Sequence, residues 1–191
     1  MQGLNNPIGI KSLEPNPSPF IINPYRFVSG ISTRGVYCGG GTSGSPSNVM
    51  DYITIATTGN ATDFGDLTVS RGQGAGCSNG TRGVYCGGLS SNVMDYITIA
   101  TTGNATDFGD LTGSKGYINA GGINNETRGL IGGGYPVSGD MIQYITIATT
   151  GNATDFGDLT VGRHSLAGVE DETRGVWAGG KNASNNRVNT I

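Results

Sequence analysis

The sequence is poor in the residue types that most often carry chemistry. It contains one histidine, one tryptophan and three cysteines, and charged residues make up only 13% of its 191 residues. No run of 18 apolar residues occurs, so the chain offers no candidate transmembrane helix. The formal net charge of −3 arises from scattered residues, and no basic patch points to a phosphate backbone. These absences argue against nucleic-acid binding and membrane insertion.

The N-terminal region lacks a basic segment followed by an apolar stretch, which predicts a protein made in a cytoplasm. Residues 1–24 instead hold five of the seven prolines, at Pro7, Pro15, Pro17, Pro19 and Pro24. Proline favours extended backbone over helix. We therefore expect an extended N-terminal arm over residues 1–24. It would anchor a neighbouring subunit, complete part of the fold or form a disordered leader.

Glycine is abundant, with 35 residues, which disfavours long helices because each interior glycine costs a helix about 1 kcal/mol. No three-residue period occurs, so the chain is not collagen-like. Two of the three cysteines, Cys38 and Cys86, lie in identical RGVYCGG segments, where the third and fourth copies have Gly132 and Ala178. This position predicts a small buried thiol, and a Cys38–Cys86 disulfide or a shared metal stays open as an alternative.

Two internal repeats organise the rest of the chain. The seventeen residues YITIATTGNATDFGDLT occur unchanged from Tyr52, Tyr96 and Tyr144. A second marker, Thr-Arg-Gly, recurs at steps of 48, 46 and 46 residues and each time precedes a pair of adjacent glycines. The four units are led by Thr33, Thr81, Thr127 and Thr173. A period in the high forties with a double glycine is typical of propeller-type repeats.

Each unit divides into four pieces of strand length, bounded by Gly, Asn, Ser or Asp. In the second unit these are VSRGQGAGCSNG, RGVYCGG, NVMDYITIA and the segment around NATDFGDLT. Turn signals at intervals of about 8–12 residues predict an all-β fold with four short antiparallel strands per unit. We predict a β-propeller over residues 25–191, with four blades and the N-terminal segment helping to close the ring. Closure between chains and an open stacked array are the alternatives.

The segment RGVxxGG followed by DYITIATTGNATDFGDLT resembles the kelch-like repeats of virion proteins of marine bacteriophages. The resemblance is to phages that infect cyanobacteria and related ocean bacteria in particular. The resemblance covers nearly everything from Thr33 onward. The first 32 residues carry none of the motif, and the last copy stops at RVNTI. The resemblance implies a virion protein of a tail fibre or capsid surface. Its partners would be other virion proteins, further copies of itself and a host-surface glycan or receptor.

Three repeated acidic pairs are the main candidates for chemistry. They are Asp63 and Asp66, Asp107 and Asp110, and Asp155 and Asp158. Carboxylates with a nearby Asn suit Ca²⁺, but the spacing favours a turn whose carboxylates accept backbone amides. The repeated arginines Arg34, Arg82, Arg128 and Arg174 are expected to pair with acids such as Asp66, Asp110 or Asp158, or alternatively to line a central channel.

The sequence predicts no catalytic residue, cofactor site or metal site, and the protein is expected not to be an enzyme. The single histidine, His164, is a poor candidate for a general base, because a lone histidine is more often a solvated or hydrogen-bonded loop residue. A polysaccharide-degrading enzyme and a cytoplasmic kelch-type adaptor are the alternative functions. The segments after the glycine pairs differ between units, as GTSGSPSNVMD, LSSNVMD, YPVSGDMIQ and KNASNNRVNTI. Variable loops of this kind favour a binding face.

Overall fold

The computed structural model describes residues 33–42, 45–89, 91–112, 122–134, 139–171 and 173–191. These residues form β-strands and no helix, so the predicted all-β class is confirmed. In this described part, no helix has the length and apolar character needed to cross a bilayer. The predicted arm over residues 1–24 lies outside the described residues.

The strands form antiparallel sheets that follow the four sequence units. The first sheet has the order β1-β4-β5, from β1 (Arg34–Cys38), β4 (Val49–Thr54) and β5 (Thr62–Asp66). A small hairpin of β2 (Gly41–Thr42) and β3 (Ser45–Pro46) extends from it. The second sheet has the order β6-β7-β8-β9, from β6 (Ala75–Ser78), β7 (Arg82–Gly88), β8 (Ser91–Thr98) and β9 (Thr106–Asp110).

The third and fourth sheets continue the same order along the chain. The third is β10-β11-β12-β13, from β10 (Ile123–Asn124), β11 (Arg128–Gly132), β12 (Met141–Thr146) and β13 (Thr154–Asp158). The fourth is the pair β14 (Ala167–Glu170) and β15 (Gly175–Ala178). The four antiparallel strands predicted for each unit are thus present in the second and third units.

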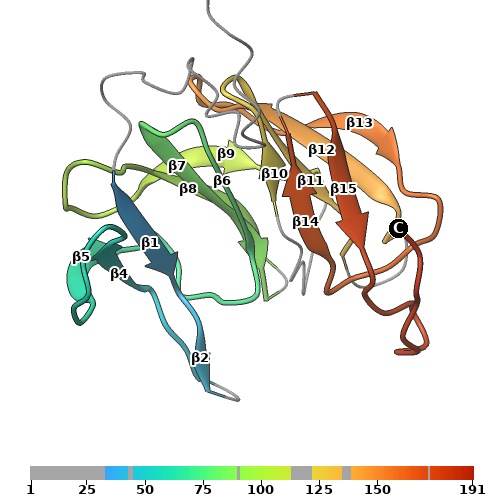
Figure 1. Ribbon diagram of the computed structural model, residues 1–191, viewed down its shortest axis with the longest axis horizontal. Helices are drawn as coiled ribbons and strands as arrows, with labels where there is room; N and C mark the ends of the chain where they lie inside the picture. The colour runs from blue at the N-terminus through green and yellow to red at the C-terminus, as the bar shows by residue number, and fades with distance from the viewer. Residues whose placement is uncertain (1–32, 43–44, 90, 113–121, 135–138, 172) are drawn as a thin grey trace, which may run out of the picture.

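Figure 1 shows the first sheet on the left, the second in the middle and the third on the right, with β14 and β15 of the fourth sheet in front of the third. Equivalent strands pair in equivalent registers: Val84 faces Tyr96 across β7 and β8, as Val36 faces Tyr52 and Leu130 faces Tyr144. The first three units are therefore successive copies of one design, and the fourth repeats the beginning of that design.

The glycine pair at the end of the second strand of each unit has a conformational cause. Gly39 and Gly40 have φ values of +63° and +106°, and all four pairs lie at positive φ. Glycine adopts this region without the penalty that a Cβ imposes. The amide of Gly40 donates a 3.0 Å hydrogen bond to the carbonyl of Arg71, in the linker to the next sheet. Positive φ therefore accounts for glycine at both positions of each pair.

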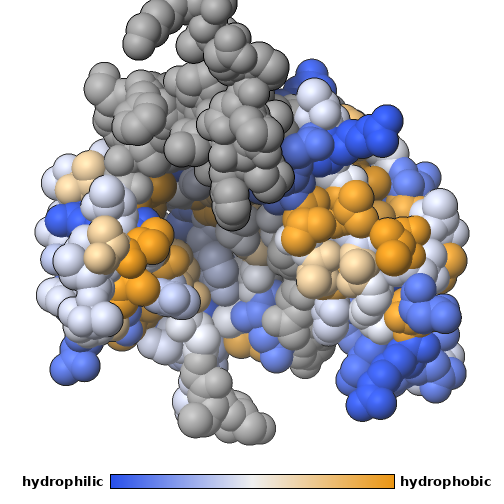
Figure 2. Space-filling view, in the orientation of Figure 1, coloured by the Kyte–Doolittle hydropathy of each residue, from blue (hydrophilic) through white to orange (hydrophobic). Residues whose placement is uncertain are grey.

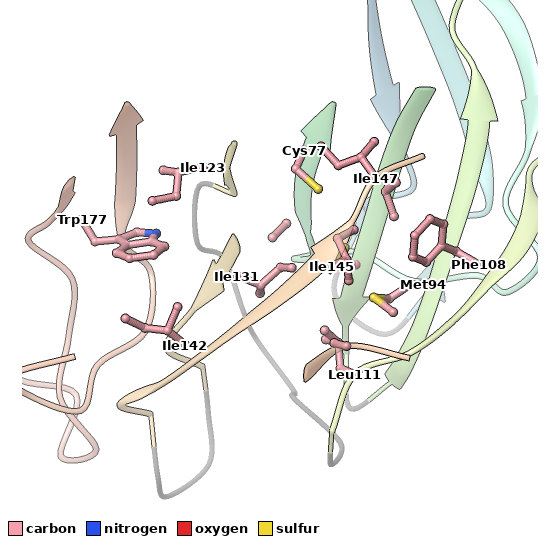
Figure 3. Packing of buried hydrophobic residues seen from close by; sticks show 14 of the residues in the cluster. Cys77, Met94, Phe108, Leu111, Ile123, Ile131, Ile142, Ile145, Ile147 and Trp177 are labelled. Carbon is pink, nitrogen blue, oxygen red and sulfur yellow. The ribbon is translucent and has the colours of Figure 1, made fainter. Parts of the chain in front are cut away.

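Apolar side chains fill the spaces between neighbouring sheets. One cluster lies between the first and second sheets and includes Met50, Phe64 and Ile97. A larger cluster joins the second, third and fourth sheets, and Figure 3 shows Trp177 beside Ile142, at the opposite end of the cluster from Met94 and Phe108. Burying an Ile, Met or Phe side chain contributes about 1.5–3 kcal/mol, so these clusters hold the sheets together.

The end sheets lack this cover on one side. Ile55 is 69% exposed, whereas Ile99 and Ile147, at the same position of the seventeen-residue repeat, are 8% and 0% exposed. The burial of Ile99 and Ile147 therefore does not extend to Ile55. Its sheet is the first, and no described residues cover that face. Figure 2 shows further apolar surface near the fourth sheet, where Val169 and Val176 are exposed.

Candidate functional site: the seams between sheets

A turn in the seventeen-residue repeat joins each sheet to the preceding one. In the second unit, the side-chain oxygen Oδ1 of Asn104 accepts a 3.1 Å hydrogen bond from the backbone amide of Asp66 in β5. The amides of Gly103 and Ala105 donate to the carbonyls of Phe64 and Asp66 at 2.7 and 2.8 Å. We call this contact between a Gly-Asn-Ala turn and the outer strand of the preceding sheet the seam.

The next seam repeats the same bonds. Asn152 Oδ1 accepts from the amide of Asp110 at 3.0 Å, and Gly151 and Ala153 donate to the carbonyls of Phe108 and Asp110. The seam also leaves no room for a side chain on the outer strand. A Cβ on Gly65, whose φ is +138°, would lie 2.5 Å from the carbonyl carbon of Gly103. These contacts account for the turn of the second and third copies and for the TDFGD segment of the first and second copies.

The repeated arginines reach across the same seam. Arg34 Nη1 donates to the carbonyls of Ile99 and Ala100 at 3.3 and 2.9 Å. Its guanidinium lies 4.4 Å from the centre of the Tyr52 ring, a cation–π contact. Arg82 repeats this arrangement with the carbonyls of Ile147 and Ala148 and the ring of Tyr96, and Arg128 lies over Tyr144.

The prediction that these arginines pair with Asp66, Asp110 or Asp158 is therefore wrong. Among the described residues, no ion pair joins any of them to an acid of the repeat. The reason is the strand order: β4 separates β1, which carries Arg34, from β5, which carries Asp66. Two strand spacings amount to roughly 10 Å, which places Asp66 out of hydrogen-bonding reach of Arg34. The guanidinium donates instead to carbonyls of the next turn, which are closer and otherwise lack a partner.

The one ion pair of the described residues involves an arginine that the sequence analysis did not single out. Arg71 Nη1 lies 2.9 Å from Asp95 Oδ2, and both side chains are almost fully buried. Arg71 also donates from Nε to the carbonyl of Gly87 and from Nη2 to that of Tyr85. Asp95 accepts from the hydroxyl and the amide of Thr68 at 2.6 and 3.1 Å. Every charged oxygen of Asp95 is thus hydrogen-bonded, as a buried carboxylate requires.

A sequence signal for this pair exists. A basic residue follows the Asp-Leu-Thr of the repeat at the same distance in all three copies, as Arg71, Lys115 and Arg163. Its partner is harder to see because the third sheet has Gln143 where the second has Asp95. Gln143 Oε1 accepts hydrogen bonds from the amide and hydroxyl of Thr112, at 2.7 and 2.6 Å. It therefore replaces Asp95 in the bonds to threonine.

The acidic pairs of the repeat do not gather into a metal centre. Among the described residues, no group of three or more His, Cys, Asp and Glu could hold an ion. In the third unit, Asp155 Oδ1 accepts a 3.0 Å hydrogen bond from the amide of Gly157, in line with the predicted turn. The seam depends instead on the asparagines, whose role the sequence analysis missed. The invariant Gly-Asn-Ala between copies was the available signal.

The three cysteines and the single histidine do not form a common reactive site in the described structure. Cys38, Cys77 and Cys86 are free thiols, so the alternative of a Cys38–Cys86 disulfide does not hold. Burial raises the pKa of the Cys38 thiol from 9.0 to about 11. A hydrogen bond with Cys77, followed by burial, raises the pKa of Cys86. Burial and the nearby Lys181 lower the pKa of His164, which favours its neutral form.

A cavity of about 460 Å³ opens between the first and second sheets. Its wall is mostly apolar, with Val36, Met50 and Ile97, and Arg34 and Asn124 contribute polar groups. A space of this size and character suits a small apolar group. It contains the carbonyl-bound arginine of the first seam but no nucleophile–base pair among its described lining residues.

Comparison with known proteins adds no family. No protein-family model matches the chain, and no curated protein matches it.

Proposed function

We propose that the protein is a non-enzymatic structural component of a bacteriophage particle, located on a tail fibre or the capsid surface. In this proposal it contributes to assembly with other virion proteins and binds a glycan or receptor of the host surface. The observation that carries the proposal is the contrast between constant and variable segments within each unit. Residues of the seams are identical between copies, whereas the loops after the glycine pairs differ.

The seam residues support a scaffold role. Asn104 and Asn152 make the same hydrogen bond in successive units, and Arg34 and Arg82 bind equivalent carbonyls. A shared solution at each seam is what a repeat scaffold requires. The resemblance of these same residues to phage kelch-like repeats gives the scaffold its proposed setting in a virion.

The variable loops support a binding role. They follow the second strand of each unit, at residues 41–48, 89–92, 135–140 and 181–187. Figure 1 shows β1 and β15 running in the same direction, so the loops after them leave from the same edge of the molecule. Loops that vary on one edge of a repeat array form its usual contact surface.

The finer architecture belongs to the same proposal. We infer a kelch-like propeller of four blades, in which each sheet is one blade and the N-terminal segment helps to complete the ring. The two complete four-stranded sheets and the packing of each sheet against the next support this inference. A closed ring protects the edges that an open array would expose.

Immunogold microscopy of marine phage particles, with antiserum raised against the purified chain, tests the location. We expect gold particles on the tail or the capsid. A binding assay tests the role: the fluorescently labelled chain is incubated with marine cyanobacterial cells and with their extracted surface polysaccharide. Unlabelled particles together with no binding to either target would contradict the proposal.

A loop-exchange variant provides the matched control. Residues 41–48 are replaced by Leu-Ser-Ser-Asn, the shorter loop that the second unit carries between its glycine pair and Val93. The scaffold stays intact because the new loop already connects equivalent strands. Reduced binding with an unchanged unfolding temperature would support recognition by the loops. Release of new sugar ends during the assay would instead favour the polysaccharide-degrading alternative.

A further inference from the structure

Arg163 is a buried cation whose hydrogen bonds are incomplete. Only 2% of the residue is exposed, and its Nη2 donates to the carbonyl of Trp177 at 2.9 Å. Its Nε and Nη1 atoms are buried and have no hydrogen-bond partner in the described structure. Buried polar groups in folded proteins are almost always paired, and an unpaired buried charge is especially costly. Arg163 therefore requires an anionic partner that the described residues do not supply.

Arg71, the equivalent arginine before the second sheet, identifies the group that fits. It donates from Nη2 to the carbonyl of Tyr85 in β7, which corresponds to the bond that Arg163 makes to Trp177 in β15. Its Nη1 lies 2.9 Å from the carboxylate of Asp95, a residue of β8. The group that fits Nη1 of Arg163 is therefore a carboxylate on a strand that corresponds to β8.

The edge of β15 on which such a strand would lie is open in the described structure. In the second sheet, β7 pairs with β6 on one edge and with β8 on the other. In the fourth sheet β14 and β15 correspond to β6 and β7, and no described strand pairs with the other edge of β15. Thr190 lies at the first position of this edge, because its carbonyl accepts from Gly179 as that of Met141 does from the third glycine pair. An added strand therefore pairs with β15 from the position of Asp95 onward.

The outer strand of the third sheet is open as well. β13 has the same TDFGD sequence as β5 and β9, which receive the Gly-Asn-Ala turns of the following sheets. Phe156 of β13 is 50% exposed, whereas Phe64 and Phe108 are each 2% exposed. A Cβ on Gly157 would meet no atom within 4 Å, whereas one on Gly109 would lie 2.5 Å from the next turn. Because the three sequences are identical, the difference lies in the partner: β13 receives no turn from the described residues.

We propose that the fourth sheet binds a β-hairpin of a partner chain that carries the seventeen-residue repeat and the aspartate before it. The first strand of this hairpin adds to the open edge of β15, a form of strand addition, and places its aspartate against Arg163. Its Gly-Asn-Ala turn binds the amide of Asp158 in β13 and forms a further seam. One hairpin thus supplies both the carboxylate that Arg163 lacks and the turn that β13 lacks. The inference does not depend on the proposed role in a virion.

Two further side chains are placed to receive the hairpin. Thr160 corresponds to Thr68, whose hydroxyl and amide donate to Asp95, and it has no such partner in the described part of the chain. Arg174 corresponds to the arginine that covers the Tyr96 ring in the second sheet. The tyrosine that follows the aspartate of the hairpin would therefore lie under the guanidinium of Arg174. Within residues 33–191, the three hairpins of this sequence each belong to a sheet of their own, so none of them is left for the fourth.

A synthetic peptide with the sequence of residues 95–112, DYITIATTGNATDFGDLT, tests the site. It is acetylated at its N-terminus, carries fluorescein at its C-terminus and is titrated with the full chain while fluorescence anisotropy is recorded. We expect saturable binding of one peptide per chain. Two control peptides leave the protein unchanged: Asp95→Asn removes the carboxylate, and Asn104→Ala removes the acceptor of the seam. Each should bind about tenfold more weakly or worse.

A protein variant tests the carboxylate contact from the other side. Arg163→Met should weaken binding of the unchanged peptide about tenfold or more, and should leave the affinity for the Asp95→Asn peptide within about twofold. Lys181→Gln, which removes a cation near the same sheet without touching the open edge of β15, is the matched control and should bind as the wild type does. If Arg163→Met does not fold, the peptide series on the unchanged protein decides.

Hydrogen exchange locates the bound peptide. Binding should slow the exchange of amides in Gly175–Ala178 and Thr154–Asp158 about tenfold or more, while those of Arg34–Cys38 stay unchanged. Three results would each overturn the proposal: no saturable binding up to about 1 mM, equal affinities of the three peptides, or protection that lies outside β13 and β15.

Discussion

At the scale of residues, one position of the repeat shows how surroundings decide the role of a side chain. Asp95 is buried against Arg71 and is hydrogen-bonded to Thr68. Asp51 occupies the same register position in the first sheet, facing Asp63 as Asp95 faces Asp107. It is only partly buried and makes no hydrogen bond or ion pair within the described part of the chain. The two aspartates are therefore a natural pair of test and control.

Asp95→Asn is expected to lower the free energy of unfolding by about 3 kcal/mol, because it leaves the buried Arg71 guanidinium without its counter-charge. The same exchange at Asp51 should change stability by less than about 0.5 kcal/mol. Urea denaturation of both variants at 25 °C measures the difference. Equal effects at the two positions would mean that the buried pair contributes no more than an exposed carboxylate.

The Cys38 thiol predicts an alkaline loss of stability. Burial raises its pKa from 9.0 to about 11, so an unfolded chain releases this proton while the folded chain still holds it. The contribution is complete below pH 9 and is lost as the pH rises from about 9 to about 11. Urea midpoints across this range should fall less steeply in Cys38→Ala. Part of the fall should persist, because burial also raises the pKa of Tyr85. An identical slope in the variant would contradict the assignment to Cys38.

At the scale of elements, the strands were largely predictable and the linkers were not. The predicted segment RGVYCGG coincides with β7 (Arg82–Gly88), and NVMDYITIA contains most of β8. Alternation of apolar residues between turn signals carries that information. The segment VSRGQGAGCSNG forms a strand only at Ala75–Ser78, because Arg71 leaves the sheet to bind Asp95. That ion pair joins residues 24 positions apart, and the third sheet has Gln143 in place of the aspartate. The sequence pattern alone therefore did not reveal it.

The Gly-Asn-Ala turn allows an element-level test with an internal control. Asn104→Ala removes the acceptor for the amide of Asp66 and should lower the free energy of unfolding by about 1 kcal/mol. Asn60→Ala makes the same change in the same sequence, where the turn is exposed and meets no preceding sheet in the described structure. We expect no measurable effect from it in thermal or urea unfolding. A comparable loss at Asn60 would show that the turn itself, and not the seam, needs the asparagine.

At the scale of the whole molecule, the sheets differ in how well they are covered. The second sheet packs against neighbours on both sides and buries Val84, Cys86 and Met94 at 3%, 0% and 0% exposure. The first sheet leaves Tyr37 at 64% and Ile55 at 69%. In repeat arrays, stability is the sum of the units and of the contacts between neighbours. The second sheet therefore has one more such contact than the first in the described structure.

Hydrogen exchange should follow this difference. Amides of β7 and β8 are expected to exchange about tenfold more slowly or better than those of β1 and β4, because local opening is easier where fewer apolar contacts must break. Mass spectrometry of peptides from the two sheets measures the rates on one sample. Since the strands share nearly the same sequence, intrinsic exchange rates cancel in the comparison. Uniform protection would mean that the sheets open together as one cooperative body.

The seams are formed only by the seventeen-residue repeat and by the arginine of the Thr-Arg-Gly marker. Many of their hydrogen bonds use main-chain atoms. A recombination event that inserts the 44 or 48 residues from one Tyr-Ile-Thr-Ile to the next would therefore add one complete sheet with a seam on each side. A lineage that carries this gene can lengthen or shorten the array in whole units while every loop remains free to diverge.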